Sequence, residues 1–188
     1  APRRACYTPR KRPAMYAASA FHSASVTVDE YLRSEFEPDA DYVDGEIEER
    51  PMGEYDHASW QEAILKWFWR HETEWRIRAK PELRIRTSAT RFRVPDVTIM
   101  RRDQPIEQIL THPPFAVFEV LSPEDRLRRM SRKLGDYAAM GIGHVYVIDP
   151  EGPVYYRFQN GELRLAAEFG AAGEAIHFPL AAIAALLD

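Results

Sequence analysis

Several features that mark other protein classes are missing from this chain of 188 residues. Its single cysteine, Cys6, cannot form an internal disulfide, which excludes a disulfide-stapled fold and a cysteine-rich zinc site. No apolar run approaches the roughly 20 residues that cross a bilayer. No glycine-rich segment resembles a phosphate-binding loop. These absences predict a cytoplasmic protein with no membrane partner.

Basic charge is also scarce overall, because the net charge is −4. A protein that coats nucleic acid electrostatically is therefore not expected, and local basic clusters would have to contact any polyanion. The segment 1–25 is basic and holds no acid. We interpret it as a disordered basic tail, with a targeting segment, a nucleic-acid-binding arm and a translation start upstream of Met15 as alternatives. Residues 26–188 are long enough for one domain.

Strands and helices are expected to alternate along 26–188. Thr27 and Glu30 form a capping-box pattern that begins the first helix. The predicted helices are Thr27–Ser34, Asp56–Glu72 (with Asp56 as its cap), Glu124–Met140 and Leu180–Leu187. The predicted strands are a pair within Tyr42–Glu48, then Glu82–Thr87, Phe92–Met100, Phe115–Leu121, His144–Asp149, Val154–Phe158 and Glu162–Leu165. This order predicts an α/β (α+β) fold, a mixed β-sheet flanked by helices.

Two carboxylates interrupt strands that are otherwise apolar. Glu119 lies within FAVFEVL and Asp96 within FRVPDVTI. A lone carboxylate in an apolar interior costs several kcal/mol, so each must reach an open strand end, a cation or a metal. Pro95 cannot donate a ladder hydrogen bond, which predicts a bend or an edge beside Asp96. Converging carboxylates suit Mg²⁺ or Mn²⁺. A structural ion pair with one of the nearby arginines explains them equally well; these are Arg84, Arg86, Arg91 and Arg93.

A set of short motifs gives the chain a family resemblance. In order, they are YVDGE at 42–46, VPDV at 94–97, FEVLSP at 118–123, Lys133 with Tyr137 and Gly141, and VYVIDP at 145–150. In this order they resemble the Uma-type restriction endonucleases, a branch of the PD-(D/E)XK nuclease superfamily. The resemblance covers roughly residues 27–188, and EVLSP and the YVIDP strand are its most specific parts. It implies a restriction-endonuclease-like fold for 26–188.

The resemblance also implies a metal site and a reaction. Asp96 would be the motif aspartate, Glu119 the motif acid and Glu46 a third metal ligand. The motif places a lysine two residues after the acid, where this chain has Leu121. Lys133 on the following helix is the candidate substitute, with a solvated helix lysine as the alternative. The implied reaction is hydrolysis of DNA phosphodiester bonds with Mg²⁺ or Mn²⁺.

Other side chains admit a functional and a structural interpretation. His57, beside Glu54 and Asp56, could approach the site or be a surface residue. Tyr137 lies one helical turn after Lys133 and could support it or pack in the core. Basic residues that could contact phosphates are Arg84, Arg86, Arg91, Arg93, Arg126, Arg128, Arg129 and Arg132. The four tryptophans are Trp60, Trp67, Trp69 and Trp75; they indicate packing or a homodimer contact rather than base stacking.

Three functions are therefore compatible with the sequence. The first is a divalent-metal-dependent endonuclease with DNA as its partner. The second is a catalytically inactive nuclease-fold protein that binds nucleic acid or a protein partner. The third is a structural or regulatory domain whose carboxylates form ion pairs. Metal binding separates the third from the others, and cleavage separates the first two.

Overall fold

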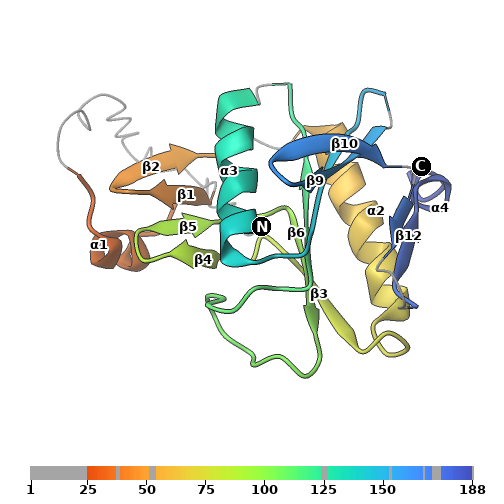
Figure 1. Cartoon of the computed structure of the whole chain (residues 1–188), viewed down its shortest axis with the longest axis horizontal. Helices are drawn as coiled ribbons and strands as arrows, with labels where there is room; N and C mark the ends of the chain where they lie inside the picture. The colour runs from red at the N-terminus through yellow and green to blue at the C-terminus, as the bar shows by residue number, and fades with distance from the viewer. Residues whose placement is uncertain are drawn as a thin grey trace, which may run out of the picture.

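The chain folds into two β-sheets, a short β-hairpin and four helices in the computed structural model, which describes residues 25–36, 39–50, 54–123, 127–152, 154–166, 168–170 and 175–187 (Figure 1). The helices are α1 Val28–Arg33, α2 Tyr55–His71, α3 Leu127–Met140 and α4 Leu180–Ala184. The strands are β1 Ala40–Val43, β2 Glu46–Glu49, β3 Ile77–Pro81, β4 Ile85–Ser88, β5 Arg91–Arg93, β6 Val97–Arg101, β7 Ala116–Val120, β8 His144–Asp149, β9 Val154–Gln159, β10 Glu162–Ala166, β11 Glu168–Gly170 and β12 His177–Pro179. In the described ranges, no helix is long and apolar enough to cross a membrane.

The larger sheet has six strands in the order β10-β9-β8-β7-β6-β3. Strands β7 and β8 are parallel and the other neighbours are antiparallel, which makes the sheet mixed. The central strand β7 is buried at every residue, as a strand covered on both faces should be. The predicted fold class, a mixed sheet flanked by helices, is confirmed.

The smaller sheet has four strands in the order β2-β1-β5-β4. Its β1–β2 hairpin turns at Asp44 and Gly45, both with positive φ, which is the backbone of the tight turn that Asp-Gly favours. The predicted strand Phe92–Met100 is divided between the two sheets, because it forms β5, then a break at 94–96, then β6. Asp96 is thus at the junction of the sheets, which explains the proline before it.

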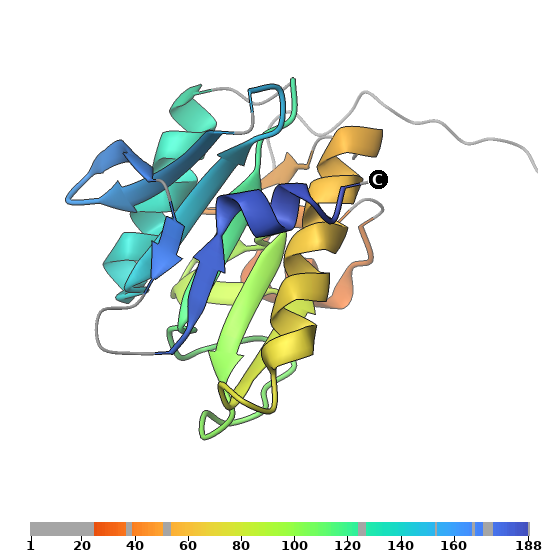
Figure 2. The same cartoon turned by 90° about the vertical axis from the view of Figure 1, so that its right-hand side faces the viewer.

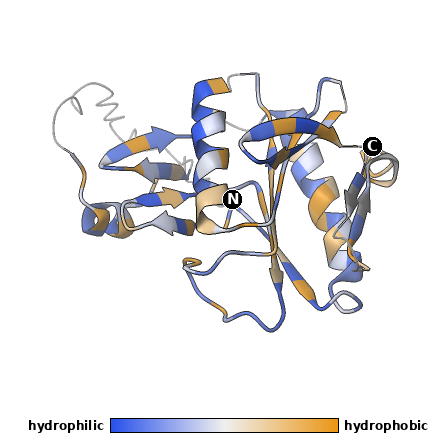
Figure 3. Ribbon diagram, in the orientation of Figure 1, coloured by the Kyte–Doolittle hydropathy of each residue, from blue (hydrophilic) through white to orange (hydrophobic). Residues whose placement is uncertain are grey.

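Helices cover both faces of the six-stranded sheet. Helix α2 packs on β3, β6 and β7, and α4 contacts α2 on the same side (Figure 2). Helix α3 lies on the opposite face, between the two sheets, and contacts β4 and β8. Hydrophobic residues follow the strands between α3 and α2 (Figure 3). The α2 side holds one apolar cluster and the α3 side another, so the sheet separates two cores.

Most element predictions are confirmed, with corrections at the ends and edges. Thr27 caps α1 through the predicted capping box with Glu30. Helix α2, however, has Glu54 at its N-cap, so Asp56 lies in its first turn and is not the cap. Strands β3, β11 and β12 were not expected, because each has only three to five residues and such short segments give a weak signal. The tail at 1–24 and the residues 124–126 lie outside the described residues.

Candidate functional site

Strand pairing brings Asp96 and Glu119 together. In the antiparallel β6–β7 pair, Val97 is opposite Phe118, so the next position of the register places Asp96 opposite Glu119. Side chains alternate along a strand. Phe118 and Val120 belong to the core under α2, and Glu119 therefore points to the other face, toward α3. Both carboxylates are buried, each with a relative exposure of 2%.

Helix α3 supplies the partners of Glu119. The Lys133 ammonium donates to Glu119 Oε2 at 2.8 Å and to the Val94 carbonyl at 3.0 Å. The Tyr137 hydroxyl, one helical turn later, donates to Glu119 Oε1 at 2.6 Å. Lys133 and Tyr137 lie on the buried stripe of α3, so this face of the helix points at the carboxylate. Burial raises the pKa of Glu119 to about 7, against the opposing charge of Lys133.

Different groups surround Asp96. Arg50, just after β2, forms an ion pair with Asp96 Oδ1. The Val120 amide donates to Oδ2 at 2.7 Å, and His57 Nε2 on α2 lies 3.3 Å from the same oxygen. Burial alone would raise the pKa of Asp96, but the hydrogen bond from His57 and the charge of Arg50 lower it to about 2. Burial likewise opposes the charged form of His57, but Asp96 outweighs it and raises the pKa of that imidazole.

These groups line a small pocket of about 30 Å³. Its wall also includes Ser122, Arg129 and Met130. The pocket is the point where β6, β7, α2 and α3 meet, and it holds both carboxylates together with four basic side chains. The structure thus brings together Asp96, Glu119 and Lys133, the three residues that the sequence predicted as catalytic.

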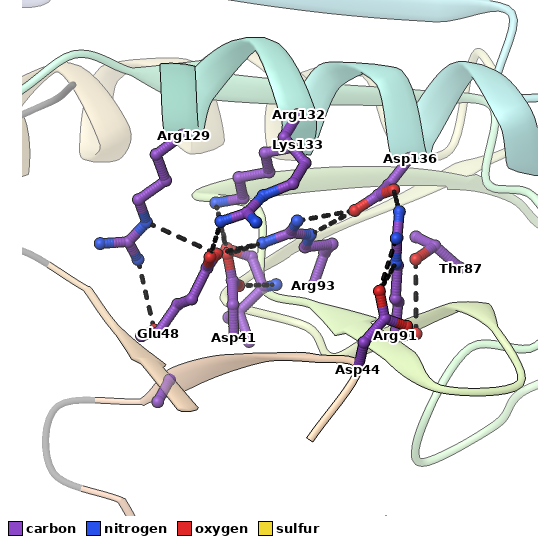
Figure 4. Close-up of polar contacts among 12 residues, drawn as sticks. Asp41, Asp44, Glu48, Thr87, Arg91, Arg93, Arg129, Arg132, Lys133 and Asp136 are labelled. Atoms are coloured by element: carbon purple, nitrogen blue, oxygen red, sulfur yellow. Dashed lines mark hydrogen bonds and ion pairs between the residues drawn. The ribbon is translucent and has the colours of Figure 1, made fainter. Parts of the chain in front are cut away.

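A buried network of charges anchors this pocket to the smaller sheet (Figure 4). Arg93 on β5 is fully buried and reaches Asp41 Oδ2 at 3.1 Å, Glu48 Oε2 at 2.8 Å and Asp136 Oδ2 at 2.8 Å. Asp41 in turn accepts from the Val94 amide at 2.8 Å and lies 3.9 Å from the Lys133 ammonium. Arg93 therefore joins both strands of the β1–β2 hairpin to α3, and this connection holds Lys133 in place.

The donor set suits a hard divalent cation. Mg²⁺ is commonly held by one or two carboxylates, with waters and substrate phosphates completing the shell. Asp96 and Glu119 provide two carboxylates on one pocket wall. In the part of the chain that the structure describes, no three His, Cys, Asp or Glu side chains form a metal-binding group. Asp96 and Glu119 are therefore the two carboxylates that could hold such a cation here.

Glu46, the expected third ligand, is not brought to this pocket. It is exposed at the start of β2, opposite Val43 and beside the Asp44-Gly45 turn. The acid of β2 that reaches the network is Glu48.

Sequence reasoning missed Arg50 and Asp41. Arg50 ends the charged run at 46–50, where nothing distinguishes it from a surface arginine. Asp41 precedes the predicted strand pair at Tyr42–Glu48, and its burial in β1 became visible only in the structure.

The predicted phosphate-contacting arginines divide into different groups. Arg93 is fully buried, and Arg91 is held by Asp44 and Asp136, so both have structural partners. Arg84 and Arg86 lie over the rings of Tyr31 and Phe92. On α3, Arg128 is exposed, Arg132 is exposed but pairs with Glu48, and Arg129 lines the pocket. Of the tryptophans, Trp60 and Trp75 are in the core, as the packing interpretation predicted.

The chain is similar in fold to a solved structure and in sequence to a family model. A crystal structure of "a putative nuclease belonging to DUF820 from Anabaena variabilis" matches with a TM-score of 0.74 and 22% identity, over 87% of this chain and 99% of that one. A cryo-EM structure of a DrdV–DNA complex matches with a TM-score of 0.40 and 18% identity, over 69% of this chain and 10% of that one. No curated protein matches. The model of the Uma2 family, described as "Putative restriction endonuclease", matches residues 28–179, and the chain therefore belongs to the Uma2 family.

Proposed function

We propose that this protein is a divalent-metal-dependent endonuclease that hydrolyses DNA phosphodiester bonds. The observation that carries the proposal is the convergence of Asp96, Glu119 and Lys133 in one pocket, with the lysine ammonium 2.8 Å from Glu119. In this proposal, Lys133 would serve as the lysine that the PD-(D/E)XK motif places two residues after the acid, where this chain has Leu121. Membership of a restriction endonuclease family supports the same reaction.

The roles of the side chains follow from their positions. Asp96 and Glu119 would hold Mg²⁺ or Mn²⁺, and that cation would supply Lewis-acid polarisation of the phosphate and activation of water. The Lys133 ammonium, fixed by Val94 and Glu119, places a positive charge beside the position where charge develops on the phosphate. Tyr137 and Asp41 orient Glu119 and Lys133. Exposed Arg128 on α3 could contact the DNA backbone, whereas Arg132 would have to leave its ion pair with Glu48 to do so.

Plasmid nicking tests the proposal. Purified protein should convert supercoiled DNA to open circles with Mg²⁺ or Mn²⁺, and EDTA should stop the reaction. Glu119→Gln and Asp96→Asn should lose at least about 100-fold in rate, since each removes a metal-binding charge. Arg164→Gln, at an exposed ion pair on β10, is the matched control and should keep full activity. Full nicking by Glu119→Gln would refute the mechanism. DNA binding without any nicking would favour the inactive nuclease-fold alternative.

A further inference from the structure

Every carboxylate oxygen of Asp96 already has a protein partner. Arg50 pairs with Oδ1, while the Val120 amide and His57 contact Oδ2. A metal cation that used Asp96 would have to replace at least one of these contacts. The Val120 amide belongs to the central strand β7 and cannot move without disturbing the sheet. Arg50 is the partner that competes directly with a cation, because it carries a full positive charge.

Arg50 is placed differently from the other buried cation of the pocket. Lys133 is enclosed by Val94, Glu119 and Asp41 on three sides. Arg50 follows the end of β2 at the edge of the smaller sheet, and its second ion pair is with Glu82, whose side chain is 49% exposed. The Arg50 side chain itself is only 10% exposed, and Glu82 gives it a second partner nearer the solvent. Its planar guanidinium also matches phosphate oxygens better than an ammonium does.

The charged residues that line the pocket also indicate that Arg50 competes with a metal cation. Arg50, Lys133 and Arg129 line the pocket together with His57, against the two carboxylates Asp96 and Glu119. Glu48 pairs with Arg129 and Asp41 lies beside Lys133, so the charge of Arg50 is the one that stands directly against a metal cation at Asp96. The remaining volume of about 30 Å³ is small for a cation with its bound waters while Arg50 stays on Asp96.

We propose that Arg50 couples DNA binding to metal binding. In the DNA-free protein its guanidinium neutralises Asp96; when DNA binds, the guanidinium moves to a backbone phosphate and leaves Asp96 to the metal. The proposal rests on the nuclease function proposed above and assigns Arg50 as a positioning residue. Because coupling between two sites is reciprocal, DNA and metal should each tighten the binding of the other.

Mn²⁺ binding in the absence of catalysis provides the test. Free Mn²⁺ is measured by electron paramagnetic resonance for wild type, Arg50→Gln and the control Arg164→Gln. Without DNA, Arg50→Gln should bind Mn²⁺ at least about tenfold more tightly than wild type, because its competitor is gone. DNA affinity, measured by fluorescence anisotropy in EDTA, should fall in Arg50→Gln. A purely structural role would weaken both, so the opposite directions distinguish the two roles. Arg164→Gln should match wild type in both assays.

The coupling itself is measured by repeating the Mn²⁺ titration with a bound DNA duplex whose phosphorothioate linkages resist cleavage. The duplex should tighten Mn²⁺ binding to wild type by about tenfold or more and change Arg50→Gln far less. Equal Mn²⁺ affinities of wild type and Arg50→Gln, in a protein that nicks DNA, would overturn the role of Arg50 and leave the nuclease function standing. Absence of Mn²⁺ binding in both proteins, with and without DNA, would overturn the nuclease function as well. If Arg50→Gln unfolds without metal, millimolar Mn²⁺ should restore its circular dichroism spectrum, and failure to do so also refutes the proposal.

Discussion

Replacing Lys133 with methionine should destabilise the protein more at high pH than at low pH. Methionine keeps most of the apolar stem and removes the ammonium that bonds Glu119 and the Val94 carbonyl. The lost bond to Val94 should cost about 1 kcal/mol at any pH. The stability lost with the Lys133–Glu119 contact depends on whether the Glu119 carboxyl is ionised. The contact can therefore be measured by comparing the stability of the two proteins at two pH values.

The pH window follows from the pKa of Glu119, which folding raises from 4.5 to about 7. The folded state therefore holds this proton more tightly than the unfolded state. The contribution of Glu119 to stability is fully present below pH 4.5, decreases as the pH rises to about 7, and is then constant. Without Lys133 the pKa rises further, so the decrease continues above pH 7 by about 1.4 kcal/mol per pH unit.

The two proteins should therefore differ by an amount that grows with pH. At pH 6 the Glu119 contribution is nearly the same in both, and the total loss is about 1 kcal/mol. At pH 8.5, about 1.5 units above the wild-type pKa, the unpaired Glu119 increases the loss of stability in Lys133→Met by roughly 2 kcal/mol. The total loss is then about 3 kcal/mol.

Urea unfolding followed by tryptophan fluorescence at the two pH values measures this difference. In a Glu119→Gln background, Lys133→Met should lose its pH dependence between pH 6 and pH 8.5, because the carboxyl whose pKa folding raises to about 7 has been removed. Lys66→Met is the matched control; its ion pair with Glu62 on α2 is exposed and should contribute less than about 1 kcal/mol at either pH. An equal loss at pH 6 and pH 8.5 for Lys133→Met would refute the assigned coupling between Lys133 and Glu119.

Three further substitutions test the surrounding structure. Arg93→Met leaves Asp41, Glu48 and Asp136 without their shared cation and should lower the free energy of unfolding by at least about 3 kcal/mol in urea; a loss below 1 kcal/mol would contradict the network. Tyr137→Phe removes a 2.6 Å hydrogen bond to Glu119 and should cost about 1–3 kcal/mol, with the larger loss at pH 8.5, where the carboxylate is charged; a pH-independent loss would argue against that contact. Thr27→Ala removes the α1 cap and should cost about 1 kcal/mol by thermal unfolding while nicking is unchanged; reduced nicking would show that α1 supports the site.

Much of the fold could be predicted from local patterns. The capping box at Thr27, the Asp-Gly turn and the apolar run around Glu119 each determine a local conformation with few neighbours involved. The division of Phe92–Met100 could not be predicted in full, because Pro95 indicates a bend but not that the strand continues into a second sheet. Ile77–Pro81 was missed because its edge position depends on pairing with β6.

For the candidate site, the sequence by itself determined that Asp96 and Glu119 need a positive partner, because carboxylates in apolar strands are costly without one. Only the tertiary structure decided which partners they have. The β6–β7 register places the acids opposite each other, and α3 brings Lys133 and Tyr137 from later in the chain. Arg50 reaches Asp96 across 46 positions of sequence. Such contacts depend on how separate elements pack, which no local pattern of residues encodes.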